Sequence, residues 1–140
     1  MPLTHHPETG TIVICDFTGF ISPEMVKRRP AIVVSPRIRD RYGLCTIVPL
    51  STTPPDPVKP YHYKLHIDPP LPPPYNSPYS WVKGDMFATV SMKRLSLPHS
   101  KKDAKGKRKY EIVVIEEIDL RNIRECLLHA LGLSRLTGYL

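Results

Sequence analysis

The chain has 140 residues, of which 41% are hydrophobic and 24% charged, and its formal net charge is +7. This composition is typical of one soluble globular domain, and no apolar run approaches the roughly 20 residues that a membrane-spanning helix needs. The N-terminal residues lack the basic and apolar regions of a secretory signal, so a cytoplasmic protein is expected. The positive net charge favours an anionic partner, and nucleic acid is the first candidate.

Three strands are predicted in the first part of the chain. Residues 10–17 are rich in β-branched side chains, 30–36 form an apolar run bounded by prolines, and 44–53 end in a cluster of hydroxyl groups. The unbroken apolar character of 30–36 predicts burial on both faces of the sheet. Short strands without an intervening helix indicate an antiparallel barrel or sandwich.

A proline-rich insertion follows at about 54–78, with ten of the seventeen prolines of the chain. Within it, residues 61–67 alternate in polarity and predict a strand at a sheet edge, because prolines flank them. The rest of the insertion is expected to be an extended surface connector. Residues 80–95 then return to strand character.

The last third of the chain predicts a basic loop and a helix. Residues 99–109 carry six Lys or Arg and one Asp, a pattern typical of a solvated loop or of a guide for a phosphate backbone. Residues 110–118 fit a strand or a helix. Residues 119–131 predict an amphipathic helix with Asp119 as its N-cap. The expected fold is therefore mainly β with a C-terminal helix, a small antiparallel barrel in one domain spanning 1–140.

The cysteine and histidine patterns argue against a metal or cofactor site. The three cysteines are widely spaced and form no CxxC pair, and the six histidines show no ligand spacing. Buried thiols that pack as small apolar groups are expected instead. We predict neither a metal nor a cofactor.

Arg29 is the first candidate for chemistry. It precedes Pro30, which favours extended backbone geometry, and it stands at the start of a buried strand. A guanidinium held by a rigid element suits phosphate recognition. The alternative is a salt bridge to Asp16 or Glu24.

Two further groups can contribute. The hydroxyls of Ser51 and Thr52 end the third strand, where they can donate to phosphate oxygens or serve as turn residues. Lys83 and Asp85 are two positions apart and would share one face of a strand, as an ion pair or as an acid and base.

Four blocks of the sequence together resemble the PemK/MazF family of toxins from bacterial toxin–antitoxin pairs. The blocks occur in order between residue 10 and about 95: "GTIVICDF", "KRRPAIVVSP", "TIVPLSTT" and "VKGDMFATVSMKRL". The resemblance implies an SH3-like barrel with a C-terminal helix, assembled as a homodimer. It also implies a sequence-specific, metal-independent endoribonuclease that cuts single-stranded RNA and is occluded by a cognate antitoxin.

The resemblance assigns roles to particular residues. Arg29 matches the arginine of the family's Arg-Pro signature, and the active hydroxyl falls on Ser51 or, with a shift of one residue, on Thr52. Lys83 and Asp85 match an Arg-x-Asp pair, with lysine in place of arginine. RNA contacts are expected from five more residues: Glu24, Lys27, Arg28, Lys93 and Arg94.

The implied reaction joins the RNA 2′-oxygen to the adjacent phosphorus and leaves 2′,3′-cyclic phosphate and 5′-hydroxyl ends. In it Asp85 takes the 2′-proton, Arg29 stabilises the charge on phosphorus, and Arg29 or Lys83 protonates the leaving oxygen. Five aromatic side chains can stack on bases or pack in the core: Trp81, Tyr61, Tyr63, Tyr75 and Tyr79.

Two other functions remain open from the sequence. CcdB-type toxins, which share the fold, bind and poison DNA gyrase without cutting RNA. The second alternative is a non-catalytic module that binds its own operator together with a partner. Lys83 keeps it open, because a lysine in place of the family's arginine makes no planar bidentate phosphate contact.

Overall fold

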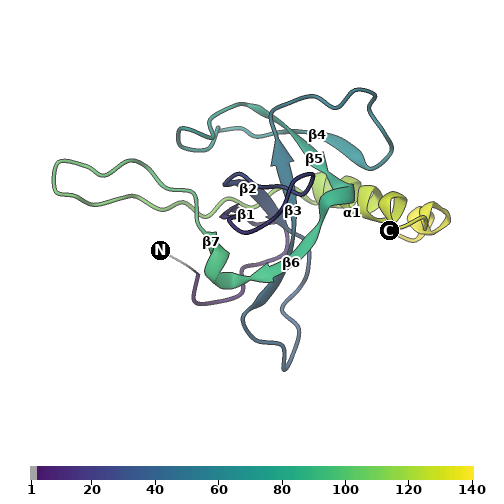
Figure 1. Cartoon of the computed structure of the whole chain (residues 1–140), viewed down its shortest axis with the longest axis horizontal. Coiled ribbons are helices and arrows are strands. Elements are labelled where there is room, and N and C mark those ends of the chain that lie inside the picture. Colours follow the sequence, from purple (N-terminus) through teal and green to yellow (C-terminus); the bar gives the residue numbers. More distant parts are fainter. Residues whose placement is uncertain (1–2) are drawn as a thin grey trace.

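The computed structural model describes residues 3–140, and all the strands among them belong to one antiparallel sheet (Figure 1). The hydrogen-bonded order of the strands is β4-β5-β3-β2-β1-β7, and β6 pairs separately with β3. The strands are β1 (Ile12–Cys15), β2 (Arg29–Val33), β3 (Leu44–Ser51), β4 (His62–His66), β5 (Tyr79–Lys83), β6 (Ala88–Ser91) and β7 (Leu95–Ser96). Three 3-10 turns and one helix complete the elements: η1 (Gly84–Met86), η2 (Met92–Arg94), α1 (Glu117–Ala130) and η3 (Ser134–Tyr139).

The predicted fold class, mainly β with a C-terminal helix, is confirmed, but the sheet does not close into a full barrel. Its two ends, β4 and β7, remain separate edges because no ladder joins them. The edge position predicted for residues 61–67 is thus correct for β4, whose only strand partner among residues 3–140 is β5.

The strand character predicted for 80–95 is confirmed, and the stretch divides into three strands separated by two turns. β5 pairs with the end of β3, through Leu50 and Val82, whereas β6 pairs with the beginning of β3, through Ile47 and Ala88. The chain therefore has to change direction between them, and it does so at Gly84 in η1.

Alternate residues of the central strands enter two cores on opposite sides of the sheet. In β2, Ala31 and Val33 pack with Phe17, whereas Ile32 packs with Leu65 and Ile123 of the other core. All of these side chains are at most 1% exposed. The prediction that 30–36 is buried on both faces is confirmed for Ala31–Val33, and a strand covered on both sides holds its neighbours rigidly.

The helix begins earlier than predicted, and its N-cap is not Asp119. Glu116 occupies that position, and Asp119 lies inside the first turn, where its carboxylate accepts a hydrogen bond of 2.6 Å from the Tyr63 hydroxyl. This bond ties α1 to β4. The preceding segment forms no regular element, although its backbone pairs with the start of β1 through Val113 and Ile115.

The basic loop at 99–109 is a hairpin that projects away from the sheet (Figure 1). His99 and Tyr110 close it by a bridge, and the Asp103 carboxylate accepts the backbone N–H groups of Lys105 and Lys107 at its tip. Every residue from 101 to 110 is exposed. Among residues 3–140, no helix has the length and apolarity to cross a membrane.

The three cysteines are buried and unpaired, as predicted. Burial raises the pKa of the Cys15 thiol to about 12, and those of Cys45 and Cys126 to about 11. Thiols with such values carry almost no thiolate near neutral pH, which is the form that reacts. They act as packing groups.

Candidate functional site

A surface pocket brings together Arg29, Ser51 and Thr52, the three residues at the centre of the sequence prediction. The register of β2 and β3 explains this, because Ala31 lies opposite Pro49 and two further steps along both strands place Arg29 opposite Ser51. The pocket has a volume of about 240 Å³. Its lining consists of Lys27, Arg28, Arg29, Pro30, Leu50, Ser51, Thr52, Thr53, Pro74, Tyr75 and Ser80.

The Arg29 guanidinium has unused hydrogen-bonding capacity. Among the described residues, it makes one long hydrogen bond of 3.5 Å from Nη1 to the Leu50 carbonyl oxygen, and its buried Nε has no partner. Burial lowers the pKa of Arg29, whereas the charge of Tyr75 acts in the opposite direction. A buried donor without a partner is costly in a folded protein. It therefore marks a place where an anion would be stabilised.

The salt-bridge alternative for Arg29 is not what the structure shows. Arg28, rather than Arg29, pairs with Asp16, at 3.3 Å between Nη2 and Oδ2. The Glu24 carboxylate accepts the backbone N–H of Ile21 at 3.2 Å. The guanidinium of Arg29 therefore remains available to a ligand in the pocket.

The two candidate hydroxyls differ in how firmly they are held. Ser51 is half-buried, and its Oγ accepts the backbone N–H of Thr53 at 3.2 Å. This bond uses an oxygen lone pair and leaves the hydroxyl proton for donation to a ligand. Thr52 is exposed. Both line the pocket, but only Ser51 is oriented by a hydrogen bond of its hydroxyl within the described chain.

Asp85 and Glu24 do not line this pocket. They line a different pocket of about 340 Å³, between the β1–β2 loop and η1. Asp85 lies in the 3-10 turn beyond the end of β5, so the strand alternation that placed it on one face with Lys83 does not apply. Asp85, the predicted base, therefore does not share a pocket with Arg29, and its role stays a prediction.

His62 lies close to Lys83 and has no role in the sequence prediction. It lies opposite Lys83 in the ladder of β4 and β5, and its Nδ1 accepts the backbone N–H of Lys59 at 3.0 Å. Burial and the charge of Lys83 lower its pKa, while Asp85 raises it. The imidazole is thus neutral near pH 7. In the sequence, the alternation of "YHYKLH" indicates only that His62 shares a face with Lys64.

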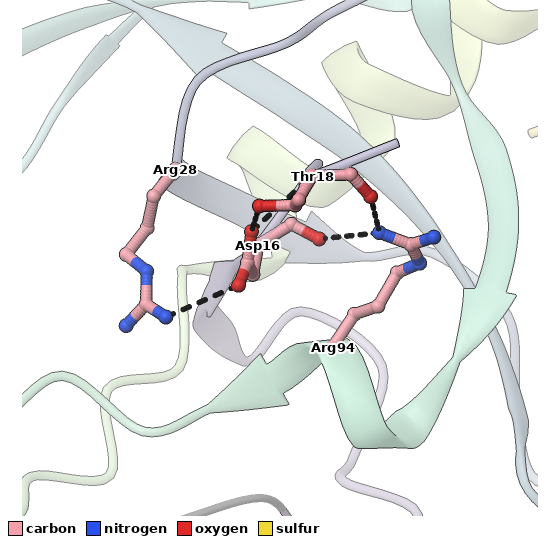
Figure 2. Close-up of polar contacts among 4 residues, drawn as sticks. All are labelled: Asp16, Thr18, Arg28 and Arg94. Carbon is pink, nitrogen blue, oxygen red and sulfur yellow. Dashed lines mark hydrogen bonds and ion pairs between the residues drawn. The ribbon is translucent and has the colours of Figure 1, made fainter. Parts of the chain in front are cut away.

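A polar network anchors the loop that carries Lys27 and Arg28 beside the pocket. Figure 2 shows Arg28 and Arg94 approaching Asp16 and Thr18 from opposite sides. Arg94 Nη1 donates to the carbonyl oxygens of Asp16, at 3.0 Å, and Thr18, at 2.6 Å. Hydrogen bonds from Thr18, and then the Arg28 guanidinium, lower the pKa of Asp16.

This network gives Arg94 an internal role that the sequence did not predict. The guanidinium also lies over the Phe20 ring, at 5.1 Å from its centroid. Lys93, in contrast, is exposed and lies in η2 away from the Arg29 pocket. The expected contribution of these two residues to RNA binding remains a prediction.

Replacing Arg94 by methionine should loosen the β1–β2 loop and lower the free energy of unfolding by about 1–3 kcal/mol, because two hydrogen bonds to a charged donor are lost. Chemical denaturation measures the loss, and amide exchange should accelerate over residues 16–28. Lys93→Met is the matched control. Equal exchange of this loop in both variants would contradict the anchoring role.

Among residues 3–140, no three His, Cys, Asp or Glu side chains lie close enough together to hold a metal ion. The groups in the Arg29 pocket that can act on a bound phosphate include the guanidinium and the hydroxyls that line it.

Comparisons with known proteins agree with the fold. Residues 8–130 match the sequence model of the family described as PemK-like, MazF-like toxin of type II toxin–antitoxin system. No curated protein sequence matches the chain. Several solved structures share its fold at low sequence identity.

Three of these structures illustrate the similarity. An endoribonuclease from a mycobacterial species has a TM-score of 0.58 at 22% identity, over 92% of this chain and 94% of that one. MazF from Deinococcus radiodurans has a TM-score of 0.65 at 19% identity, over 91% and 98%. A MazE–MazF structure from Deinococcus radiodurans has a TM-score of 0.55 at 22% identity, over 93% and 99%.

Proposed function

The chain belongs to the family of PemK-like, MazF-like toxins of type II toxin–antitoxin systems, and from this premise we propose that it is an endoribonuclease that cuts single-stranded RNA in the Arg29 pocket. The observation that carries the proposal is the buried Nε of Arg29, which has no partner among residues 3–140 and lies in one pocket with the hydroxyls of Ser51 and Thr52. A phosphodiester supplies the negative oxygens that these donors lack. The net charge of +7 agrees with such a substrate.

The reaction needs no group beyond the RNA and the side chains of the protein. The 2′-oxygen forms a bond to the adjacent phosphorus, the bond from phosphorus to the 5′-oxygen breaks, and the proton lost by the 2′-hydroxyl is balanced by one gained at the 5′-oxygen. Arg29 and one hydroxyl donate to the nonbridging oxygens, where negative charge grows.

Arg29 is also suited to deliver the proton to the leaving oxygen. An exposed arginine is a poor acid because its pKa exceeds about 12, but burial lowers the pKa of Arg29. Lys83 is the other candidate acid. Asp85 is the proposed base. Because it lines a different pocket from Arg29, its carboxylate would have to approach the 2′-hydroxyl next to the phosphate that Arg29 holds.

The family and the MazE–MazF neighbour support an antitoxin as a protein partner. We propose that a cognate antitoxin neutralises the toxin and that the toxin acts as a homodimer. We place this activity in the cytoplasm, where messenger RNA is available. The Lys27 and Arg28 side chains, which line the pocket with Arg29, are proposed to guide the RNA backbone into it.

The test is cleavage of a long unstructured RNA in the presence of EDTA, with the cut ends mapped. The expected result is cuts at a recurring short motif, with 2′,3′-cyclic phosphate and 5′-hydroxyl ends. Ser51→Ala should slow cleavage about a hundredfold through loss of a transition-state donor, whereas Thr52→Val should remain within about threefold of the wild type.

Two outcomes would contradict the proposal. Intact RNA after incubation with folded, antitoxin-free protein would leave a binding toxin or a non-catalytic module. A large loss of activity in Thr52→Val with a wild-type rate in Ser51→Ala would exchange the two hydroxyls.

A further inference from the structure

The outer face of the β4–β5 hairpin carries six side chains, of which two are lysines and four are rings. They form three directly opposed pairs: His62 with Lys83, Lys64 with Trp81, and His66 with Tyr79. Because side chains alternate across a strand, the intervening residues point the other way. Leu65 and Val82, which lie between them, are 0% exposed. The six residues, here called the hairpin face, include no carboxylate.

The rings and cations of this face are already in contact with one another. The His66 and Tyr79 rings are stacked, with centroids 4.8 Å apart and an interplanar angle of 23°. Lys64 Nζ lies 4.6 Å from the centroid of the Tyr79 ring. Tyr79 is nevertheless 47% exposed. The contacts hold its ring in a fixed orientation while much of its surface remains in water.

The hairpin face adjoins Ser51, one of the residues that line the Arg29 pocket. Ser51 of β3 lies directly opposite Trp81 of β5, and Trp81 lies opposite Lys64 of β4. Opposed residues of an antiparallel pair share a face. With strands about 4.8 Å apart, the Ser51 and Lys64 backbones lie about 10 Å from one another. One row of side chains thus crosses three strands and ends at the proposed catalytic hydroxyl.

We propose that the hairpin face binds the nucleotides on one side of the cut, with unpaired bases stacked on Trp81 and on the His66–Tyr79 pair and with phosphates next to Lys64 and Lys83. Stacking on an aromatic ring requires a base whose flat face is accessible, so the site takes single-stranded RNA. The inference rests on the proposed function, since it supplies the binding surface for the same substrate.

Charge and ring composition favour RNA over a protein partner for this face. Lys64 lies between the His62 and His66 rings, and Lys83 lies opposite the His62 ring. A nucleic-acid strand matches this combination because each nucleotide offers one phosphate and one flat base. A second copy of this chain, docked through the same face, would bring its own two lysines close to these lysines, and like charges repel. Self-association through this face is treated as an outcome of the test.

The test separates binding from cleavage by means of two probes of the same sequence. A fluorescent RNA with 2′-fluoro groups at every position lacks the nucleophile and reports binding by anisotropy, and the unmodified RNA reports cleavage. Tyr79→Leu and Trp81→Leu should each weaken binding about ten- to a hundredfold. Tyr79→Phe, which keeps the ring, should bind within about twofold of the wild type.

Two controls make the result specific. Tyr139→Leu removes another exposed tyrosine, 87% exposed in η3, and should leave binding unchanged. Lys64→Gln should reduce the slope of log affinity against log salt by about 0.7, the effect of one phosphate contact to a single strand. Melting temperatures and sedimentation are recorded for every variant.

Each outcome decides the inference. Unchanged affinity in Tyr79→Leu and Trp81→Leu, loss of self-association without loss of RNA binding, or absence of RNA binding by the wild type would overturn it. Cleavage of the unmodified RNA is judged separately. Expected binding losses without any cleavage by the wild type would uphold the hairpin face as an RNA site and reject the proposed endoribonuclease.

Discussion

Arg29→Ala should reduce RNA cleavage by about a hundred- to a thousandfold, the loss expected when one donor to a developing oxyanion is removed. The fold should tolerate this change, because the guanidinium makes only one long internal contact, of 3.5 Å, and its Nε has no partner among residues 3–140. Removing an unsatisfied buried donor can even raise the free energy of unfolding.

Single-turnover cleavage measures the effect, with melting temperatures recorded in parallel. Arg37→Ala is the matched control, because Arg37 is exposed in the loop after β2 and does not line the pocket. Arg29→Lys keeps a charge but loses the planar fork, and should recover only part of the rate. A folded Arg29→Ala protein that cleaves at the rate of the wild type would remove this residue from the mechanism.

Gly84→Ala should have the largest effect on stability, lowering the free energy of unfolding by about 1–3 kcal/mol or more. A Cβ at this position would lie 2.6 Å from the carbonyl oxygen of Tyr61 and 2.9 Å from the Cβ of Cys126. The first of these is backbone and the second belongs to α1, so neither can turn aside. Relief of the overlap requires α1 and the β4–β5 hairpin to separate.

Denaturant-induced unfolding, followed by far-UV circular dichroism, measures this loss. Gly138→Ala is the control, because a Cβ there would have no neighbour within 4 Å, and it should unfold at the denaturant concentration of the wild type. A Gly84→Ala protein as stable as that control would mean that the helix is not packed as tightly against η1 as the structure indicates.

The elements that were predicted correctly from the sequence are those whose structure is specified by residues close together in the chain. The apolar run before Pro36 and the β-branched residues after Gly10 specify β2 and β1, because each is a continuous stretch that suits a buried strand. The break at Gly84 was missed because its cause is long-range. Nothing in the residues next to Gly84 indicates that Cys126, about forty positions later in α1, occupies the space above this glycine.

The same distinction applies to the site. Arg29 and Ser51 were predicted to act together, and they share a pocket because the register of two adjacent strands brings them together. Asp85 was placed by strand alternation, which ends at Lys83. The helix start was also misplaced, since Asp119 serves β4 through Tyr63 rather than capping α1.

The edge position of β4 has a consequence for how the protein behaves at high concentration. An edge strand exposes backbone donors and acceptors that can join the sheet of another molecule, which is a common route to aggregation. Here the strand is only five residues long, prolines stand at positions 60 and 69 on either side of it, and Lys64 lies at its centre. These features disfavour the recruitment of a further strand by the open edge, so we expect the protein to resist aggregation through β4 at high concentration.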